Sequence, residues 1–147
     1  MRLVFGEKDA PYEEARVVVL PVPYDLSLSF LPGARRGPEA ILLASRELEP
    51  FLLELGAAPE EVGIHAAEPV PWVAGMAEES HRLIREEALK HLRAGKWLVA
   101  LGGDHSVTHP LVQAHREALG EFSLLHVDAH ADLRDAYRSI TQRRLVE

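Results

Sequence analysis

The sequence predicts an α/β fold in which helices cover a parallel β-sheet. Three apolar runs have the length and composition of buried strands, at residues 15–22, 97–101 and 122–127. Amphipathic segments with helical spacing lie between them, the longest at residues 76–94. Strands that alternate with helices call for parallel pairing, because each helix carries the chain back to the same end of the sheet.

Prolines mark the element boundaries in the first half of the chain. Pro21 and Pro23 end the first strand, since proline cannot donate a hydrogen bond to a sheet ladder. Pro38 predicts the start of a helix, where its missing N–H costs nothing. A weaker strand candidate follows at residues 61–66, before a proline-containing loop at residues 68–73.

Glycines mark the boundaries in the second half. Gly95 is a natural stop for the long helix, and Pro110 lies in the first turn of another helix that Gly120 ends. The strands predicted on either side of that helix, at residues 97–101 and 122–127, both run into polar loops. We expect these loops to meet at the carboxyl edge of the sheet, where parallel α/β sheets bind ligands.

Length and composition indicate an ordinary globular protein. The 147 residues suit one domain, which we expect to span residues 1–147. The net charge of −7 argues against a nucleic-acid partner, and the absence of cysteine excludes disulfides and thiolate chemistry. The start is acidic and no apolar run is long enough to span a membrane, so we expect no signal peptide, no membrane partner and a cytoplasmic location.

Metal-ligand residue types are concentrated after the last two strands. Asp128, His130 and Asp132 stand at i, i+2 and i+4, so an extended chain would place them on one face. Carboxylates beside an imidazole suit a divalent transition metal such as Mn2+, with Zn2+, Co2+ or Fe2+ as competitors. His105 adds a second imidazole from the preceding strand end. The sequence therefore predicts a metal site built from two loops.

Several residues near this site have simpler interpretations when taken singly. Asp104 alone would be a turn or helix-cap residue. Gly102 and Gly103 would be turn positions that use the conformational freedom of glycine. His126 precedes Asp128 by two residues and could share the ligand face, but we interpret it as a buried, hydrogen-bonded group behind the ligands.

The ligand set favours hydrolysis. Two carboxylates and two imidazoles suit a pair of divalent ions, which would lower the pKa of bound water and aim it at an electrophilic carbon. No protein nucleophile is then required. This agrees with the absence of cysteine and of a Gly-x-Ser-x-Gly motif.

Two segments resemble the signatures of the ureohydrolase family, which contains arginase, agmatinase and formiminoglutamase. They are Gly-Gly-Asp-His-Ser at residues 102–106 and Asp-Ala-His-Ala-Asp at residues 128–132. Residues 32–41 (Pro-Gly-Ala-Arg-Arg-Gly-Pro-Glu-Ala-Ile) also resemble the amino-terminal part of agmatinase-type members. The resemblance runs from about Val17 to Tyr137. It implies a three-layer α/β/α fold, two Mn2+ ions in the complete site, and hydrolysis of a guanidino group to urea and an amine.

The resemblance also implies roles for individual residues. His105 would bind one manganese ion and His130 the other, while Asp128 and Asp132 would bind or bridge both. A hydroxide bridging the two ions would attack the guanidinium carbon. Members of the family are commonly trimers or hexamers, so a homo-oligomer is expected.

The resemblance also bears on the substrate, through a position just after the second signature. Arginases usually carry asparagine two residues after the last aspartate of that signature, whereas this sequence has Arg134, in a run at residues 132–137 that is more like bacterial agmatinases. We therefore favour agmatine or aminopropylagmatine, giving a polyamine and urea, and the sequence identifies no substrate-binding residue. The alternatives are arginase or formiminoglutamase activity, a deacetylase-like hydrolase with one Zn2+, and a non-catalytic homologue that binds metal or partner subunits.

The chain also departs from the family pattern. Family domains are about twice as long, and an Asp-x-Asp motif with two further ligands should follow. A Ser-His-Ala segment with a proton-shuttle histidine should come soon after Tyr137, but residues 138–147 contain no histidine. We expect a fragment or truncated product that has little activity alone and that exposes an apolar sheet edge.

Overall fold

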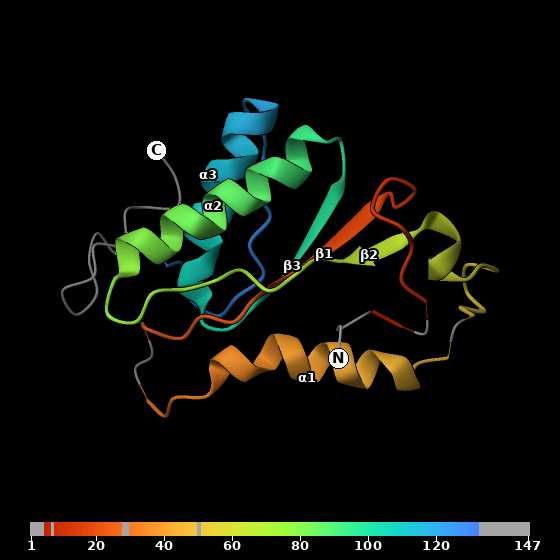
Figure 1. Ribbon diagram of the computed structural model, residues 1–147, viewed down its shortest axis with the longest axis horizontal. Coiled ribbons are helices and arrows are strands. Elements are labelled where there is room, and N and C mark those ends of the chain that lie inside the picture. Colours follow the sequence, from red (N-terminus) through yellow and green to blue (C-terminus); the bar gives the residue numbers. More distant parts are fainter. Residues whose placement is uncertain (1–4, 7, 28–29, 50, 133–147) are drawn as a thin grey trace.

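β1 is the central strand of a three-stranded parallel sheet with the order β2-β1-β3 (Figure 1). In this computed structural model β1 spans Val17–Val22, β2 spans Ile64–Ala66 and β3 spans Trp97–Gly102. Both neighbours pair with β1 in parallel, which confirms the predicted class of sheet. The structure describes residues 5–6, 8–27, 30–49 and 51–132.

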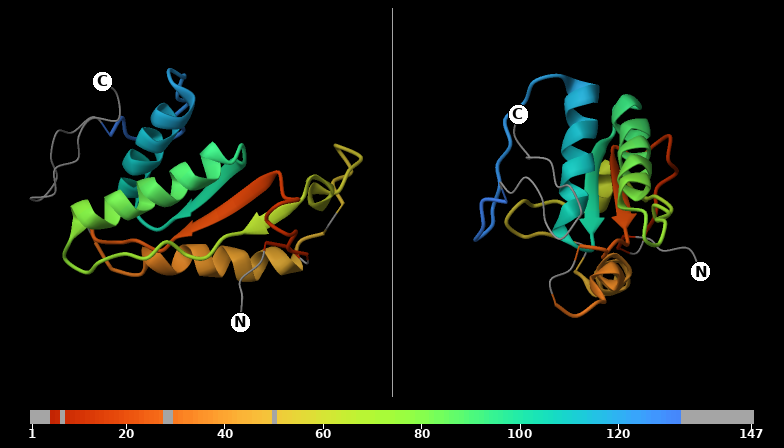
Figure 2. Two further views of the ribbon diagram at one scale, coloured as in Figure 1. Left: turned by 45° about the horizontal axis from the view of Figure 1, so that its top comes forward. Right: turned by 90° about the vertical axis from the view of Figure 1, so that its left-hand side faces the viewer.

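Helices cover both faces of the sheet, so the fold has three layers (Figure 2). α1 (Gly37–Ala44) lies on one face, and α2 (Ala77–Arg93) and α3 (Thr108–Leu119) lie together on the other. The chain leaves β1 for β2 in one direction and returns past β1 to β3. Right-handed connections in opposite directions place their helices on opposite faces, which explains the layers. The predicted α/β/α architecture is confirmed.

The core lies on both sides of β1, because successive residues of a strand point to opposite faces. One cluster, between β1 and the helices α2 and α3, contains the buried side chains of Val18, Leu20, Val22, Ile84, Ala88, Leu89 and Ala114. The other, on the α1 side, contains Val19, Leu42 and Ile64. The continuous apolar run in β1 therefore reflects burial on both faces.

Most predicted boundaries agree with the structure. α1 begins at Gly37, directly before the predicted Pro38, and α3 ends at Gly120, whose φ of 83° lies in the left-handed region that glycine adopts readily. Short 3-10 segments complete the description, at Ala34–Arg36, Ser45–Glu47, Pro59–Val62 and His105–Val107. No helix among the described residues combines the length and apolar character that crossing a membrane requires.

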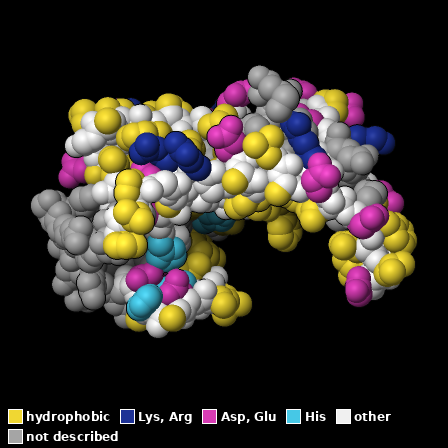
Figure 3. Space-filling view, turned by 90° about the horizontal axis from the view of Figure 1, so that it is seen from below, with side chains coloured by type: hydrophobic (Ala, Val, Ile, Leu, Met, Phe, Trp, Pro, Cys, Tyr) yellow, Lys and Arg dark blue, Asp and Glu magenta, His cyan; other side chains and the backbone are white. Residues whose placement is uncertain are grey.

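The predicted strand at residues 122–127 is wrong. These residues form no strand, and Leu125 and Val127 are 86% and 88% exposed. A strand needs a neighbour that accepts and donates its backbone hydrogen bonds, and within the described chain β3 pairs only with β1. Trp97 on β3 is 74% exposed, in line with the expected apolar edge. Figure 3 shows hydrophobic side chains along a hollowed part of the surface.

Candidate metal centre

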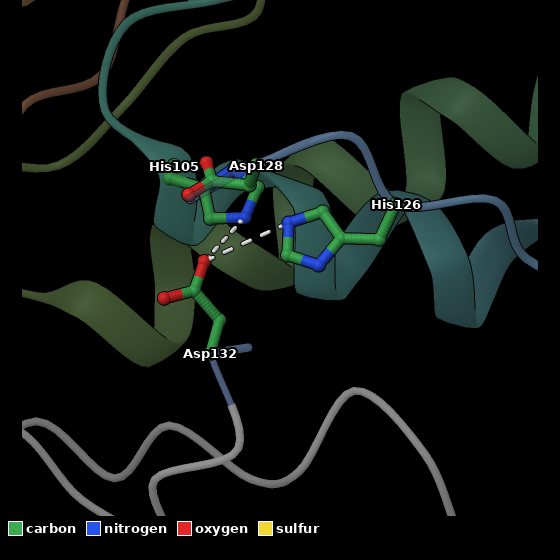
Figure 4. Close-up of side chains that lie close together, drawn as sticks. All are labelled: His105, His126, Asp128 and Asp132. Atoms are coloured by element: carbon green, nitrogen blue, oxygen red, sulfur yellow. Dashed lines mark ion pairs between the residues drawn. The ribbon is translucent and has the colours of Figure 1, made fainter. Parts of the chain in front are cut away.

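Four side chains from two loops lie close together (Figure 4). His105 follows β3, whereas His126, Asp128 and Asp132 follow α3. Each offers one ligand-type atom, and these atoms lie within 4.8 Å of one another. Histidine and acidic side chains accordingly lie next to one another at one end of the face in Figure 3.

Asp132 is the link between the two imidazoles. Its Oδ2 atom lies 2.8 Å from His105 Nε2 and 3.9 Å from His126 Nε2. The two imidazole rings stack with their centroids 5.4 Å apart and their planes only 7° from parallel. The two nitrogen atoms therefore face the same carboxylate oxygen.

This donor set fits a divalent metal ion. Ligand atoms on opposite sides of an octahedral ion with bonds of about 2.1 Å lie roughly 4 Å apart, and the atoms of this group lie within 4.8 Å of one another, so small movements of the side chains would bring them to bonding distance. His126 Nε2 is buried and has no hydrogen-bond partner among the described residues, which leaves its lone pair available to an ion. Carboxylate and imidazole donors together suit Mn2+ and its neighbours in the first transition row. The described residues form one compact ligand group.

The chain does not continue as a strand through the second signature. The backbone N–H of His130 donates to Asp128 Oδ1 at 2.8 Å, as in an Asx turn, and Asp132 has a φ of 52°. This turn breaks the period of two on which the expectation of a shared face rested, and that expectation is wrong. The same N–H, with the His130 imidazole beside it, holds the pKa of Asp128 below its usual value.

The structure places two histidines differently from the expectation from the sequence. His130 lies outside the four-residue group, with an 82% exposed side chain and its Nδ1 atom 3.2 Å from Asp128 Oδ1. His126, interpreted as a group behind the ligands, lies within it. Its spacing of two residues from Asp128 was the sequence signal for this position. The role of His130 as a ligand stays a prediction.

Gly102 and Gly103 are required for close packing and not for an unusual backbone angle. Neither has a positive φ, so the expectation that they use the conformational freedom of glycine is wrong. A Cβ atom on Gly103 would lie 2.9 Å from the carbonyl carbon of Tyr24 and closer still to its oxygen. On Gly102 a Cβ atom would lie 2.7 Å from Val107 Cγ2, at the end of a side chain.

A buried aromatic and imidazole pair lies behind the His105 loop. The Tyr24 ring is 5.4 Å from that of His81, and the Tyr24 hydroxyl has no hydrogen-bond partner among the described residues. Burial, together with the negative charge of Asp104, raises the pKa of Tyr24 to about 12. Burial also lowers the pKa of His81. Both groups are therefore neutral at physiological pH.

Replacing Tyr24 with phenylalanine is expected to remove a loss of stability at alkaline pH. The folded protein keeps the phenol proton up to about pH 12, whereas the unfolded chain releases it near pH 10. The contribution of the neutral Tyr24 phenol to the free energy of unfolding is fully present below pH 10. Roughly 2 kcal/mol of that free energy is lost as the pH rises towards the pKa of Tyr24 in the folded protein. Urea unfolding of both proteins from neutral to alkaline pH measures the difference. Parallel pH profiles for wild type and variant would contradict this assignment.

Two sequence expectations lie outside the described residues. They are the agmatinase-like position Arg134 and the segment beyond Tyr137 where a proton-shuttle histidine was sought.

A parallel sheet covered by helices, with carboxylates and imidazoles grouped beyond the carboxyl end of a strand, defines an α/β protein with a candidate metal site. Residues 15–144 match the arginase family, and the chain belongs to that family. The match includes both ureohydrolase signatures, so the predicted family is confirmed.

The chain is similar in sequence to two kinds of bacterial ureohydrolase. It is 97% identical over 133 residues to the N(1)-aminopropylagmatine ureohydrolase of Thermus thermophilus, a match that covers 90% of this chain and 45% of that enzyme. It is 37% identical over 134 residues to the agmatinase of Bacillus anthracis, covering 91% of this chain and 46% of that enzyme. The chain thus spans about half the length of these relatives.

Solved structures show the same fold. A candidate agmatinase from Clostridium difficile matches with a TM-score of 0.84 and 29% identity, covering 92% of this chain and 49% of that one. Trypanosoma cruzi formiminoglutamase with Mn2+ matches with a TM-score of 0.78 and 24% identity, covering 92% and 46%. Again the match spans about half of the solved chain.

Proposed function

We propose that this chain is the amino-terminal half of a manganese-dependent ureohydrolase that releases urea from aminopropylagmatine or agmatine, leaving a polyamine. One observation carries the proposal. In a member of the arginase family, the structure groups His105, His126, Asp128 and Asp132 beyond the carboxyl end of β3.

The four grouped residues would hold one manganese ion. Their ligand atoms lie within 4.8 Å of one another, so we assign the group to one ion. His130, exposed beside Asp128, is the residue that the sequence assigns to the second ion. When bound, manganese supplies an activated water as nucleophile and stabilises developing negative charge. The Mn2+ in the formiminoglutamase of the same fold supports this choice of metal.

The substrate proposal rests on the named relatives. Those 97% and 36% identical to this chain, from Thermus thermophilus and Synechocystis, carry the name N(1)-aminopropylagmatine ureohydrolase, and the Bacillus relatives carry the name agmatinase. Both substrates combine a guanidino group with an alkyl chain that carries amine. Of the two, we favour aminopropylagmatine, because the 97% match is to an enzyme of that name.

The experiment compares three guanidino substrates on two proteins. Urea release from aminopropylagmatine, agmatine and arginine is measured after Mn2+ loading, for the 147-residue chain and for a whole-length protein that continues this sequence as its relatives continue. We expect the whole-length protein to prefer aminopropylagmatine, and the 147-residue chain to release little urea from any substrate. The described residues form a single ligand group, which we assign to one ion, so we expect water activation by a pair of ions to need donors from the rest of the whole-length protein.

Three outcomes decide between the alternatives. Turnover of arginine without turnover of the two amines would overturn the substrate proposal in favour of arginase activity. Absence of turnover by the whole-length protein, together with stable metal-bound assemblies, would favour a non-catalytic homologue. Turnover by the 147-residue chain at ordinary enzyme rates would show that it supplies a complete site.

We further propose that the protein forms homo-oligomers, trimers or hexamers as the family resemblance implies, and acts in the cytoplasm. The proposal rests on that resemblance, and the exposed apolar side chains of Trp97, Leu125 and Val127 are compatible with a partner surface. Light scattering during size-exclusion chromatography measures the oligomeric state. A monodisperse monomer of the whole-length protein would contradict the proposal.

A further inference from the structure

The carboxylate of Asp104 joins two loops at the carboxyl edge of the sheet. One loop follows β3 and carries His105, and the other follows β1 and includes Tyr24 to Ser27. Asp104 Oδ1 accepts hydrogen bonds from the backbone N–H of Ser106 at 3.0 Å and from its hydroxyl at 2.5 Å. Asp104 Oδ2 accepts one from the backbone N–H of Ser27 at 2.8 Å. Asp104 is only 7% exposed, so these bonds are shielded from water.

Backbone contacts bring the same two loops together. The N–H of Gly103 donates to the carbonyl of Val22 at 3.1 Å, and the N–H of Asp104 donates to the carbonyl of Tyr24 at 2.8 Å. The two residues before His105 are therefore held to the loop after β1 by their backbone, and Asp104 is held by its side chain as well.

The loop after β1 is itself anchored by a second buried carboxylate. Asp25 Oδ2 accepts from the backbone N–H of Gly33 at 2.9 Å, and Asp25 Oδ1 accepts from the guanidinium of Arg35 at 3.2 Å. Asp25 is 6% exposed. Asp25 therefore holds the loop two residues before Ser27, the residue to which Asp104 is bonded.

We infer that Asp104 is a positioning residue, which sets the location of the metal ligand His105 by bridging the His105 loop to the loop after β1. This inference rests on the proposed metal site. A residue that only capped the 3-10 segment at His105–Val107 would need one carboxylate oxygen, the one that faces Ser106. The second oxygen faces Ser27, and this bond is the one that connects the loops. Both oxygens face N–H donors, and Asp104 is not in the ligand group.

The test separates bridging from capping by substitutions at Asp104. Serine and asparagine are both good N-cap residues, so Asp104→Ser and Asp104→Asn keep the cap. The serine side chain is too short to reach Ser27. Asparagine places an NH2 group opposite one of the two N–H donors, so it serves only one of them. Ser106→Ala is the matched control, because it removes one hydroxyl bond and leaves the bridge intact.

Three measurements on the 147-residue chain report the result. Mn2+ affinity is measured by titration of the electron paramagnetic resonance signal of the free ion. Hydrogen exchange of the Ser27 amide is measured by NMR, and the contact between the His105 and His126 rings is measured by the nuclear Overhauser effect. For Asp104→Ser and Asp104→Asn we expect about tenfold weaker Mn2+ binding, faster Ser27 exchange and loss of the ring contact, with circular dichroism unchanged. Ser106→Ala is expected to bind Mn2+ as wild type does, and Asp104→Glu, with two acceptor oxygens, to lie between.

Failure of this inference is distinguishable from failure of the metal site. Wild-type Mn2+ affinity in Asp104→Ser and Asp104→Asn, with fast Ser27 exchange, would overturn the positioning role. If wild type and His105→Ala bind Mn2+ equally, the proposed metal site is wrong. The contact between the His105 and His126 rings then tests whether Asp104 positions His105. Retention of this ring contact in both Asp104→Ser and Asp104→Asn would overturn the positioning role. Loss of the contact in both variants, with retention in Ser106→Ala, would support it. If either variant loses its circular dichroism spectrum, the other and Asp104→Glu carry the comparison.

Discussion

Replacing Asp132 with asparagine is expected to weaken Mn2+ binding by about 100-fold or more. Asp132 Oδ2 is the atom that both imidazole nitrogens face, so its substitution removes a charge and a ligand from the centre of the group. Substitution of groups that only support metal ligands already costs about 10- to 100-fold in metal affinity, and a direct ligand should cost at least as much. Titration of the free Mn2+ signal with the 147-residue chain measures the affinity.

Two histidine variants provide a matched comparison. His126→Ala is expected to weaken binding of the first Mn2+ ion strongly, because His126 belongs to the four-residue group. His130→Ala is expected to leave that affinity nearly unchanged, since the His130 side chain is outside the group and 82% exposed. The reverse ranking would show that the extended arrangement predicted from the sequence forms when metal binds. Equal affinities for wild type, Asp132→Asn and His126→Ala would exclude this site.

Gly103→Ala is expected to lower the free energy of unfolding by about 3 kcal/mol or more, since its methyl group would overlap the backbone of Tyr24. Main-chain atoms cannot rotate away as the end of a side chain can. The two loops that carry Tyr24 and His105 would have to separate, so Mn2+ affinity should fall together with stability. Urea denaturation followed by circular dichroism measures the change.

Two other glycines serve as controls. Gly102→Ala is expected to cost about 1 kcal/mol, because the contact is with the movable Val107 Cγ2 atom. Gly37→Ala meets only an ordinary contact at 3.6 Å in the first turn of α1, and should leave stability unchanged or raise it slightly. Equal effects of all three substitutions would mean that close approach of the backbone to Tyr24 is not the constraint.

Local sequence patterns predicted correctly those features that depend on residues within the element itself or at its ends. The apolar run of β1 predicted a strand buried on both faces, and the structure places core side chains on both of its faces. Pro38 and Gly120 marked helix ends because their backbone restrictions act within one or two residues. The run at residues 122–127 had the same apolar character but forms no strand, because strand formation depends on a neighbour and not on composition alone.

By itself, the sequence determined the α/β class, the family and the two loops that carry the candidate metal ligands, because these depend on residue type and short-range spacing. Only the tertiary structure decided which histidines meet. The turn between Asp128 and His130 replaces the strand period, and so His126 joins His105 and Asp132 while His130 faces solvent. It also decided why Gly103 is glycine and what Asp104 binds, because both depend on the loop after β1, nearly eighty residues earlier in the chain. Spacing along a chain does not report such contacts, since they arise from how β1 and β3 pair.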